Sequence, residues 1–324
     1  MSRVGVLLFW ALACGYSLGL PVHGAEAHQL RILTSFLPVY CFTAQVAGEL
    51  AEVENLLPAN VEPHDFQFSR KDLQKLTHAD LIIINGLGLE HWLDNALHNA
   101  APRGSRTVVQ ISAGLESQFI YRPRQDTLDS SHESGIGDVS SSSPAVTLPN
   151  PHIWLDPRLA SQVVTNILRA VQKADPANAN GYAANTARYL AQLHQLDQSL
   201  EQTLAPLRGA SIVTFHDAFP YFARRYGINV AGVIEPVPDV EPSLKYLASL
   251  YRAIRANRVQ AIFTEPTNPS SLARQMGSDL HLPVGPLDPL ESGPLNSNAY
   301  EQTMRSNARL LLEFLKPNAN RSSL

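Results

Sequence analysis

Three histidines lie where apolar segments of the chain give way to loops, and imidazole is a good ligand for transition metals. His64 lies in LLPANVEPHDF, His152 in LPNPHIWLDP and His216 in VTFHDAF. The first two directly follow a proline, which restricts the backbone and helps to hold a ligating ring in place. Because ligands of parallel α/β sheets bind at the carboxyl ends of the strands, we expect these side chains to lie there.

A fourth candidate ligand is Asp288, in VGPLDPL, which also ends a short apolar run and precedes a proline. The four residues are too far apart in the chain to form any short zinc motif. Three imidazole nitrogens and one carboxylate oxygen suit zinc as a four-coordinate site, whereas manganese and iron favour more carboxylate and water. The alternative is a structural role, because buried histidines are commonly packing residues.

The segments that must position these residues alternate between short apolar strands and helices. In the first half we expect strands at 30–36, 81–85 and 107–112, and helices at 38–50, 69–78 and 90–100. In the second half we expect strands at 211–215, 229–235 and 260–265, and helices near 217–227 and 241–257. Continuous apolar runs indicate strands that are buried on both faces. The sequence therefore predicts two α/β lobes, each a mostly parallel sheet flanked by helices.

One long amphipathic helix, at 177–207, separates the two halves. Its apolar residues recur at three-, four- and seven-residue steps, at Tyr182, Tyr189, Leu193, Leu196, Leu200 and Leu204. Such a helix is roughly 40 Å long, enough to run the height of both lobes, and its stiffness predicts little hinge motion. We therefore assign the N-terminal lobe to 28–176 and the C-terminal lobe to 208–324.

The N-terminus has the pattern of a secretion signal. A short basic start is followed by an apolar stretch at 4–20 and by AEA, which ends at Ala27 and fits a cleavage site. We therefore expect a signal peptide at 1–27 and an extracytoplasmic protein. Cys14 lies in ALAC, where an alanine replaces the leucine normal in a lipoprotein box, so we favour secretion over lipid anchoring. Cleavage leaves Cys41 alone, which excludes an intramolecular disulfide.

Composition excludes some classes of partner and locates one loop. Charged residues make up 17% of the chain and the net charge is −4, which argues against nucleic acid. The segment 122–150 is rich in Ser, Asp, Gly and Pro and contains a single histidine, His132. We expect a mobile surface loop there.

Six collinear motifs match one family of proteins. They are SFLPVYCFTAQVAG, LLPANVEPHDFQFSRKDLQKLTHADLIIINGLGLEHWL, NPHIWLDP, TFHDAFPYFARRYGI, FTEPTNPSSLARQMG and VGPLDPL. In this order, and over about residues 29 to 316, the chain resembles the cluster A-I metal-binding proteins of bacterial ABC importers. It is most similar to their zinc branch, the periplasmic ZnuA-like proteins.

The resemblance implies two lobes joined by one rigid helix, with a metal held in the cleft between them. The family's ligand positions fall on His64, His152, His216 and Asp288. The third position is histidine in zinc-binding members and typically glutamate in manganese-binding ones, so His216 implies zinc. Because some zinc members use water or a nearby glutamate in place of the aspartate, Asp288, Glu265 and water all stay open as the fourth ligand.

Three acidic residues near these motifs have expected supporting roles. Glu265, in FTEP, matches a family position close to the metal, and we expect it to orient a ligand. Asp217 follows His216 at the start of an expected helix, which it should cap. Glu62 is expected to be solvated.

The resemblance implies an extracytoplasmic solute-binding protein of a high-affinity zinc ABC transporter. It would be a periplasmic monomer that captures Zn²⁺ as transported ligand and delivers it to a membrane permease and its ATPase. Four protein ligands leave no open position for a reacting water, and no HExxH motif occurs, which argues against an enzyme such as a zinc hydrolase. The alternatives are manganese or iron specificity on the same fold, and a periplasmic zinc chaperone or adhesin.

Overall fold

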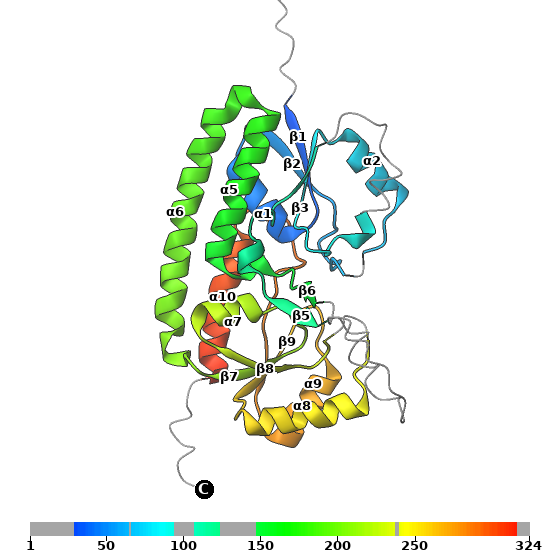
Figure 1. The fold of residues 1–324 in the computed structure, drawn as a ribbon, viewed down its shortest axis with the longest axis vertical. Coiled ribbons are helices and arrows are strands. Elements are labelled where there is room, and N and C mark those ends of the chain that lie inside the picture. Colours follow the sequence, from blue (N-terminus) through cyan, green and yellow to red (C-terminus); the bar gives the residue numbers. More distant parts are fainter. Residues whose placement is uncertain (1–28, 65, 94–106, 124–146, 237–239, 316–324) are drawn as a thin grey trace, which may run out of the picture.

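The structure is a computed structural model that describes residues 29–64, 66–93, 107–123, 147–236 and 240–315 (Figure 1). The signal peptide predicted at 1–27 and most of the loop predicted at 122–150 lie outside these ranges. Within them, no helix combines the length and the apolar character that crossing a membrane requires.

The first half folds around a wholly parallel sheet with the strand order β2-β1-β3-β4. The strands are β1 (Leu30–Thr34), β2 (Ala51–Asn55), β3 (Leu81–Ile84) and β4 (Thr107–Gln110). Helix α1 (Leu37–Ala47) connects β1 to β2, and α2 (Arg70–His78) lies between β2 and β3. The sequence did not predict β2, because this edge strand alternates buried and exposed residues and lacks a continuous apolar run.

The second half repeats this arrangement with the order β10-β9-β7-β8, again wholly parallel. Its strands are β7 (Ser211–Thr214), β8 (Asn229–Val233), β9 (Ala261–Thr264) and β10 (Val284–Pro286). Helices α7 (Pro220–Tyr226), α8 (Leu244–Ala256) and α9 (Ser271–Leu280) connect and flank them (Figure 1). The two sheets confirm the prediction of two α/β lobes.

Two short strands lie between the lobes. Strands β5 (Tyr121–Pro123) and β6 (Thr147–Pro149) pair antiparallel, so the predicted loop 122–150 has paired strands at its ends. Single-turn helices complete the connections: η1 (Glu116–Gln118), η3 (Ile153–Leu155), η4 (Pro176–Asn178) and η5 (Ala205–Leu207).

The long helix α6 (Ala179–Leu204) runs along the side of the molecule past both sheets (Figure 1). It packs against α5 (Pro157–Ala174), α10 (Ala299–Leu315), α1 and α7. All six residues of its predicted apolar stripe are buried, which confirms that stripe. Helix α10 returns from the second sheet to contact α1, and one continuous core spans both halves. The lobe boundaries at 176 and 208 stay a prediction.

A buried carboxylate ties α6 to the helices on either side of it. Asp197 of α6 accepts hydrogen bonds from Arg158 of α5 and from Arg225 and Tyr226 of α7. Burial by itself raises the pKa of Asp197, but the bonds from Arg225 and Arg158 outweigh it and hold the pKa below its ordinary value. The ionised form is therefore the one that the fold stabilises.

We expect Asp197→Ala to lower the free energy of unfolding by about 3 kcal/mol, because it leaves the guanidinium of Arg225 buried without its main partner. Urea unfolding of the purified protein measures this change. The matched control is Glu201→Ala, which removes a more exposed partner of the same Arg225 and should lower the free energy of unfolding much less. Equal losses in the two variants would contradict the importance of the buried pair.

Candidate metal centre

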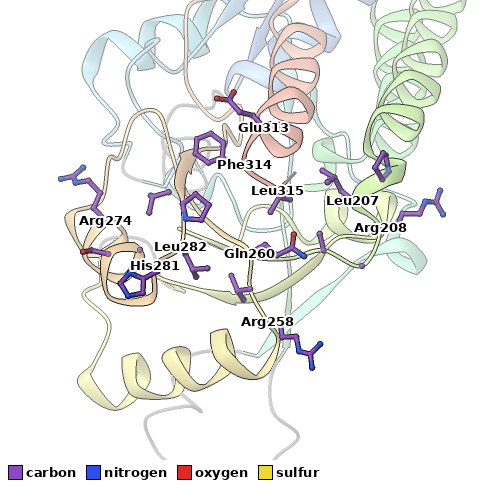
Figure 2. A pocket seen from close by; sticks show the side chains of 18 residues that line it. Leu207, Arg208, Arg258, Gln260, Arg274, His281, Leu282, Glu313, Phe314 and Leu315 are labelled. Atoms are coloured by element: carbon purple, nitrogen blue, oxygen red, sulfur yellow. The ribbon is translucent and has the colours of Figure 1, made fainter. Parts of the chain in front are cut away.

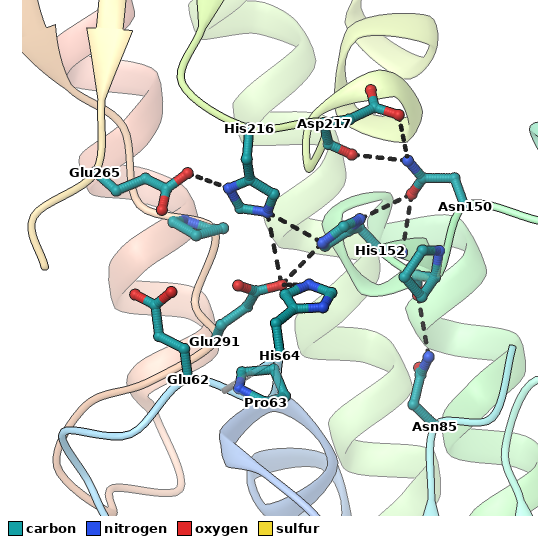
Figure 3. Close-up of polar contacts among 12 residues, drawn as sticks. Glu62, Pro63, His64, Asn85, Asn150, His152, His216, Asp217, Glu265 and Glu291 are labelled. Atoms are coloured by element: carbon teal, nitrogen blue, oxygen red, sulfur yellow. Dashed lines mark hydrogen bonds and ion pairs between the residues drawn. The ribbon is translucent and has the colours of Figure 1, made fainter. Parts of the chain in front are cut away.

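Four side chains converge at the junction of the two halves, those of His64, His152, His216 and Glu291 (Figure 3). One ligand atom from each lies within 4.8 Å of all the others. The Oε1 atom of Glu291 lies 2.8 Å from Nε2 of His152, 3.5 Å from Nε2 of His64 and 3.7 Å from Nε2 of His216. Three imidazole nitrogens therefore surround a single carboxylate oxygen.

Each of the four residues lies in a loop beyond the carboxyl end of a strand. His64 follows β2, His152 follows β6, His216 follows β7 and Glu291 follows β10. The His64 loop is held by the indole of Trp92, which donates a hydrogen bond to the carbonyl of Pro63 over 2.8 Å. The His64 side chain is 17% exposed, whereas that of His152 is fully buried. The solvent side of the cluster is thus the His64 side.

The two most buried imidazoles are held through their Nδ1 atoms. Nδ1 of His152 lies 2.9 Å from Oδ1 of Asn150, which also accepts a hydrogen bond from the backbone N–H of His152. Nδ1 of His216 contacts Oε1 of Glu265. With Nδ1 occupied in this way, Nε2 of each ring is the atom that faces the centre of the cluster (Figure 3). Bonds of this kind fix the tautomer and orientation of metal-binding histidines.

Two atoms of the cluster lack a hydrogen-bond partner. Among the described residues, neither Nε2 of His64 nor Oε2 of Glu291 has one, although both atoms are buried. Leaving such an atom unpaired costs about 1–3 kcal/mol, so native proteins rarely retain one without a reason. A cation coordinated by the three Nε2 atoms and the carboxylate would satisfy them. The donor set of three nitrogens and one oxygen fits a zinc ion.

The electrostatic environment favours positive charge at the centre of the cluster. Burial alone would raise the pKa of Glu291, yet the neighbouring His216, His64 and His152 hold it well below its usual range. Burial also opposes a charged His216, but Glu265 and Glu291 raise the pKa of this imidazole well above its ordinary value. Burial lowers the pKa of His152 to about 3, so this ring stays neutral and free to act as a ligand.

Asp288, the fourth ligand named from the sequence, lies outside this group of four. Its Oδ1 accepts a hydrogen bond from the backbone N–H of Leu290 over 2.7 Å, and its own backbone N–H and C=O bond the side chain of Asn307. Leu290 has a left-handed backbone, with φ of +65°. Asp288 therefore stabilises the turn that presents Glu291, a residue that the sequence analysis did not name. The only sequence signal for Glu291 was that a second carboxylate follows Asp288 by three positions, in LDPLE.

Two other acidic residues differ from expectation. The prediction that Asp217 caps the next helix is wrong, because α7 begins only at Pro220 and its N-terminus has no side-chain cap. Asp217 instead accepts hydrogen bonds from Asn150, through its backbone carbonyl at 2.7 Å and its carboxylate at 3.1 Å. Glu62, expected to be solvated, is half-buried and accepts a hydrogen bond from the hydroxyl of Thr267 in the other lobe.

A cavity of about 1340 Å³ lies at the opposite end of the second sheet (Figure 2). Its lining includes Ala210, Gln260 and Val284, which precede or begin β7, β9 and β10. The cavity is therefore at the amino ends of these strands, whereas the cluster lies beyond their carboxyl ends. None of the four clustered residues lines it. Ligands of parallel sheets bind at the carboxyl ends, so the cluster and not this cavity is the candidate site.

Two parallel-sheet lobes with a buried His₃Glu cluster at their junction define a two-lobed metal-binding protein. The family model described as "Zinc-uptake complex component A periplasmic" matches residues 32–314. The chain belongs to this family.

Named relatives and solved structures agree with this assignment. The chain is 30% identical over 279 residues to the high-affinity zinc uptake system protein ZnuA of Bacillus subtilis, covering 86% of this chain and 84% of that protein. It is also 30% identical to the zinc-binding protein AdcA of Streptococcus pyogenes, with 90% of this chain but 55% of AdcA covered. The Zn(II)-bound ZnuA-like domain of Streptococcus pneumoniae AdcA is similar in structure, with a TM-score of 0.68 and 27% sequence identity. The match covers 89% of this chain and 100% of that domain.

A second buried carboxylate supports the loop beside His152. Glu90 accepts hydrogen bonds from the hydroxyl of Ser35 and from the backbone N–H groups of Asn85 and Gly86, over 2.7–3.0 Å. The side chain of Asn85 in turn donates to the carbonyl of Pro151, over 3.0 Å. Burial outweighs these bonds and raises the pKa of Glu90 to about 7.

Glu90 should make the stability of the metal-free protein depend on pH. Because its pKa is raised in the folded state, its contribution is complete below the unfolded value of about 4.5 and is lost as the pH rises through about 7. Relative to Glu90→Gln, the wild type should lose about 3 kcal/mol of unfolding free energy between pH 4.5 and about pH 8. Urea unfolding at a series of pH values measures the difference. A difference that stays constant over this range would refute the raised pKa.

Proposed function

We propose that this protein is the extracytoplasmic solute-binding component of a high-affinity zinc importer. It captures Zn²⁺ at His64, His152, His216 and Glu291 and delivers the ion to a membrane permease with its ATPase. The observation that carries this proposal is the convergence of three Nε2 atoms on one buried carboxylate in a chain of the zinc-uptake family. The names of the relatives, a zinc uptake protein and zinc-binding proteins, support zinc as the cargo.

The donor set supports zinc over harder metals. Three imidazoles and one carboxylate provide the nitrogen-rich, four-coordinate shell that zinc prefers, whereas manganese favours more oxygen ligands. Two of the imidazoles are already aimed inward by bonds to Asn150 and Glu265, so little side-chain entropy is lost when the ion binds. In this proposal the zinc is cargo, and the shell closed by four protein ligands suits storage and transfer.

The shell also explains how capture can be reversible. His64 is the most exposed of the four ligands and lies on a loop of the first lobe, so we assign it as the last ligand to bind and the first to leave. Delivery to the permease then begins on this side of the cluster. We further propose that the protein acts as a periplasmic monomer.

The first test is the metal content of purified residues 28–324 with a competition titration against a chelator. We expect one tightly bound zinc per chain. His216→Ala should weaken the affinity at least about 100-fold, beyond the 10- to 100-fold effect typical of residues that only support a ligand. Manganese or iron in place of zinc would refute the proposed specificity, and a folded protein without bound metal would refute the site.

The identity of the fourth ligand is tested by a pair of substitutions. Glu291→Ala should weaken zinc binding at least about 100-fold, because it removes a ligand and the negative charge at the centre of the shell. Asp288→Asn keeps an acceptor for the N–H of Leu290, so zinc affinity should change less than about 10-fold. The same titration compares both variants with wild type. The opposite ranking would establish Asp288 as the ligand.

A further inference from the structure

The two buried histidines of the cluster differ in the charge of the group that holds them. His152 is held by the neutral amide of Asn150, whereas His216 is held by the carboxylate of Glu265. Glu265 is itself buried, with 3% of its surface exposed. Its position is fixed by the sheet, because it directly follows β9, and β9 pairs with β7, the strand that leads to His216.

A zinc ion in the proposed shell leaves a net charge that Glu291 alone cannot balance. Three neutral imidazoles and one carboxylate around a divalent cation make a buried group of charge +1. A buried net charge costs several kcal/mol unless a counter-charge lies close by. The carboxylate of Glu265 is such a counter-charge, and it contacts the ligand ring directly through Nδ1 of His216. With Glu265 included, the buried group is neutral.

We propose that Glu265 is a positioning residue that sets the zinc affinity of the site through His216, by balancing the charge of the occupied shell. This inference rests on the proposed function. An anionic acceptor on Nδ1 makes Nε2 of the same ring a stronger donor to the metal than a neutral acceptor would. His216 is therefore a stronger donor to the metal than His152, whose Nδ1 is held by the neutral amide of Asn150.

The neighbouring carboxylate of Glu62 provides the internal comparison. It is close enough to Glu265 and Glu291 for both to raise its pKa, but burial is the larger cause of this shift. Its hydrogen bond goes to Thr267 and not to a ligand ring. Glu62 therefore represents a carboxylate that acts on the site only through space, whereas Glu265 acts through its contact with His216. Comparing the two residues separates these effects.

The experiment compares Glu265→Gln with wild type, using the zinc competition titration on the full mature chain. The glutamine keeps the shape and one acceptor oxygen for the N–H of His216 but removes the charge. We expect zinc to bind about 10- to 100-fold more weakly. Glu62→Gln, the same chemical change at the carboxylate that contacts no ligand, should shift the affinity less than about 3-fold, below that range.

Two further readouts separate positioning from a role in folding. The melting temperature of metal-free Glu265→Gln should stay within about 3 °C of wild type, which is a small change in stability for a chain of this size. The visible absorption of bound Co²⁺, which reports coordination geometry, should keep its wild-type band shape. A large fall in melting temperature or an altered Co²⁺ spectrum would instead assign Glu265 a structural role and overturn the inference.

The remaining outcomes are also decisive. If wild type binds one zinc tightly and Glu265→Gln binds it equally well, the inference fails while the proposed function stands. Equal weakening in Glu265→Gln and Glu62→Gln would show that the charge does not act through His216, which also overturns it. If wild type binds no zinc, the proposed function fails and the inference fails with it.

Discussion

The burial of the Glu291 carboxylate among three imidazoles is the constraint on which the site depends. A carboxylate with almost no exposure is costly unless positive charge compensates it, and here the compensation comes from both halves of the chain. His64 and His152 approach from the first half, and His216 and Glu291 from the second. The cluster therefore forms where the two halves of the chain meet.

The packing of the helices holds that junction together. Helix α6 passes both sheets, and α10 crosses back from the second sheet to contact α1, so the larger apolar core continues from one half into the other. Opening the two halves widely would expose part of this core to water, at roughly 25 cal/mol for each Å². Asp197 adds a polar tie between α5, α6 and α7. This packing therefore argues against a wide rotation of one lobe relative to the other.

Hydrogen bonds connect the ligand residues of the cluster to the surrounding loops. Asn150 links His152 to Asp217, the residue beside His216, and Asn85 links Glu90 to Pro151, the residue beside His152. The segments around His152 and His216 are in this way linked to each other and to the first sheet. Such supports make the positions of the ligand rings a property of the fold as a whole.

The sequence by itself determined the parallel α/β lobes, because fully buried strands such as β3, β7 and β9 require the continuous apolar runs that it contains. It also determined the buried stripe of α6 and the three histidines, whose residue types stand in distinctive motifs. It did not reveal β2, whose edge position permits polar residues, nor the role of Asp217. Tertiary structure alone decided between Asp288 and Glu291 as the carboxylate that faces the histidines. Both lie in one short turn around Leu290, where the Asp288 carboxylate is used by the backbone N–H of Leu290 and the Glu291 carboxylate lies among the histidines, and this difference depends on the backbone path and not on residue type.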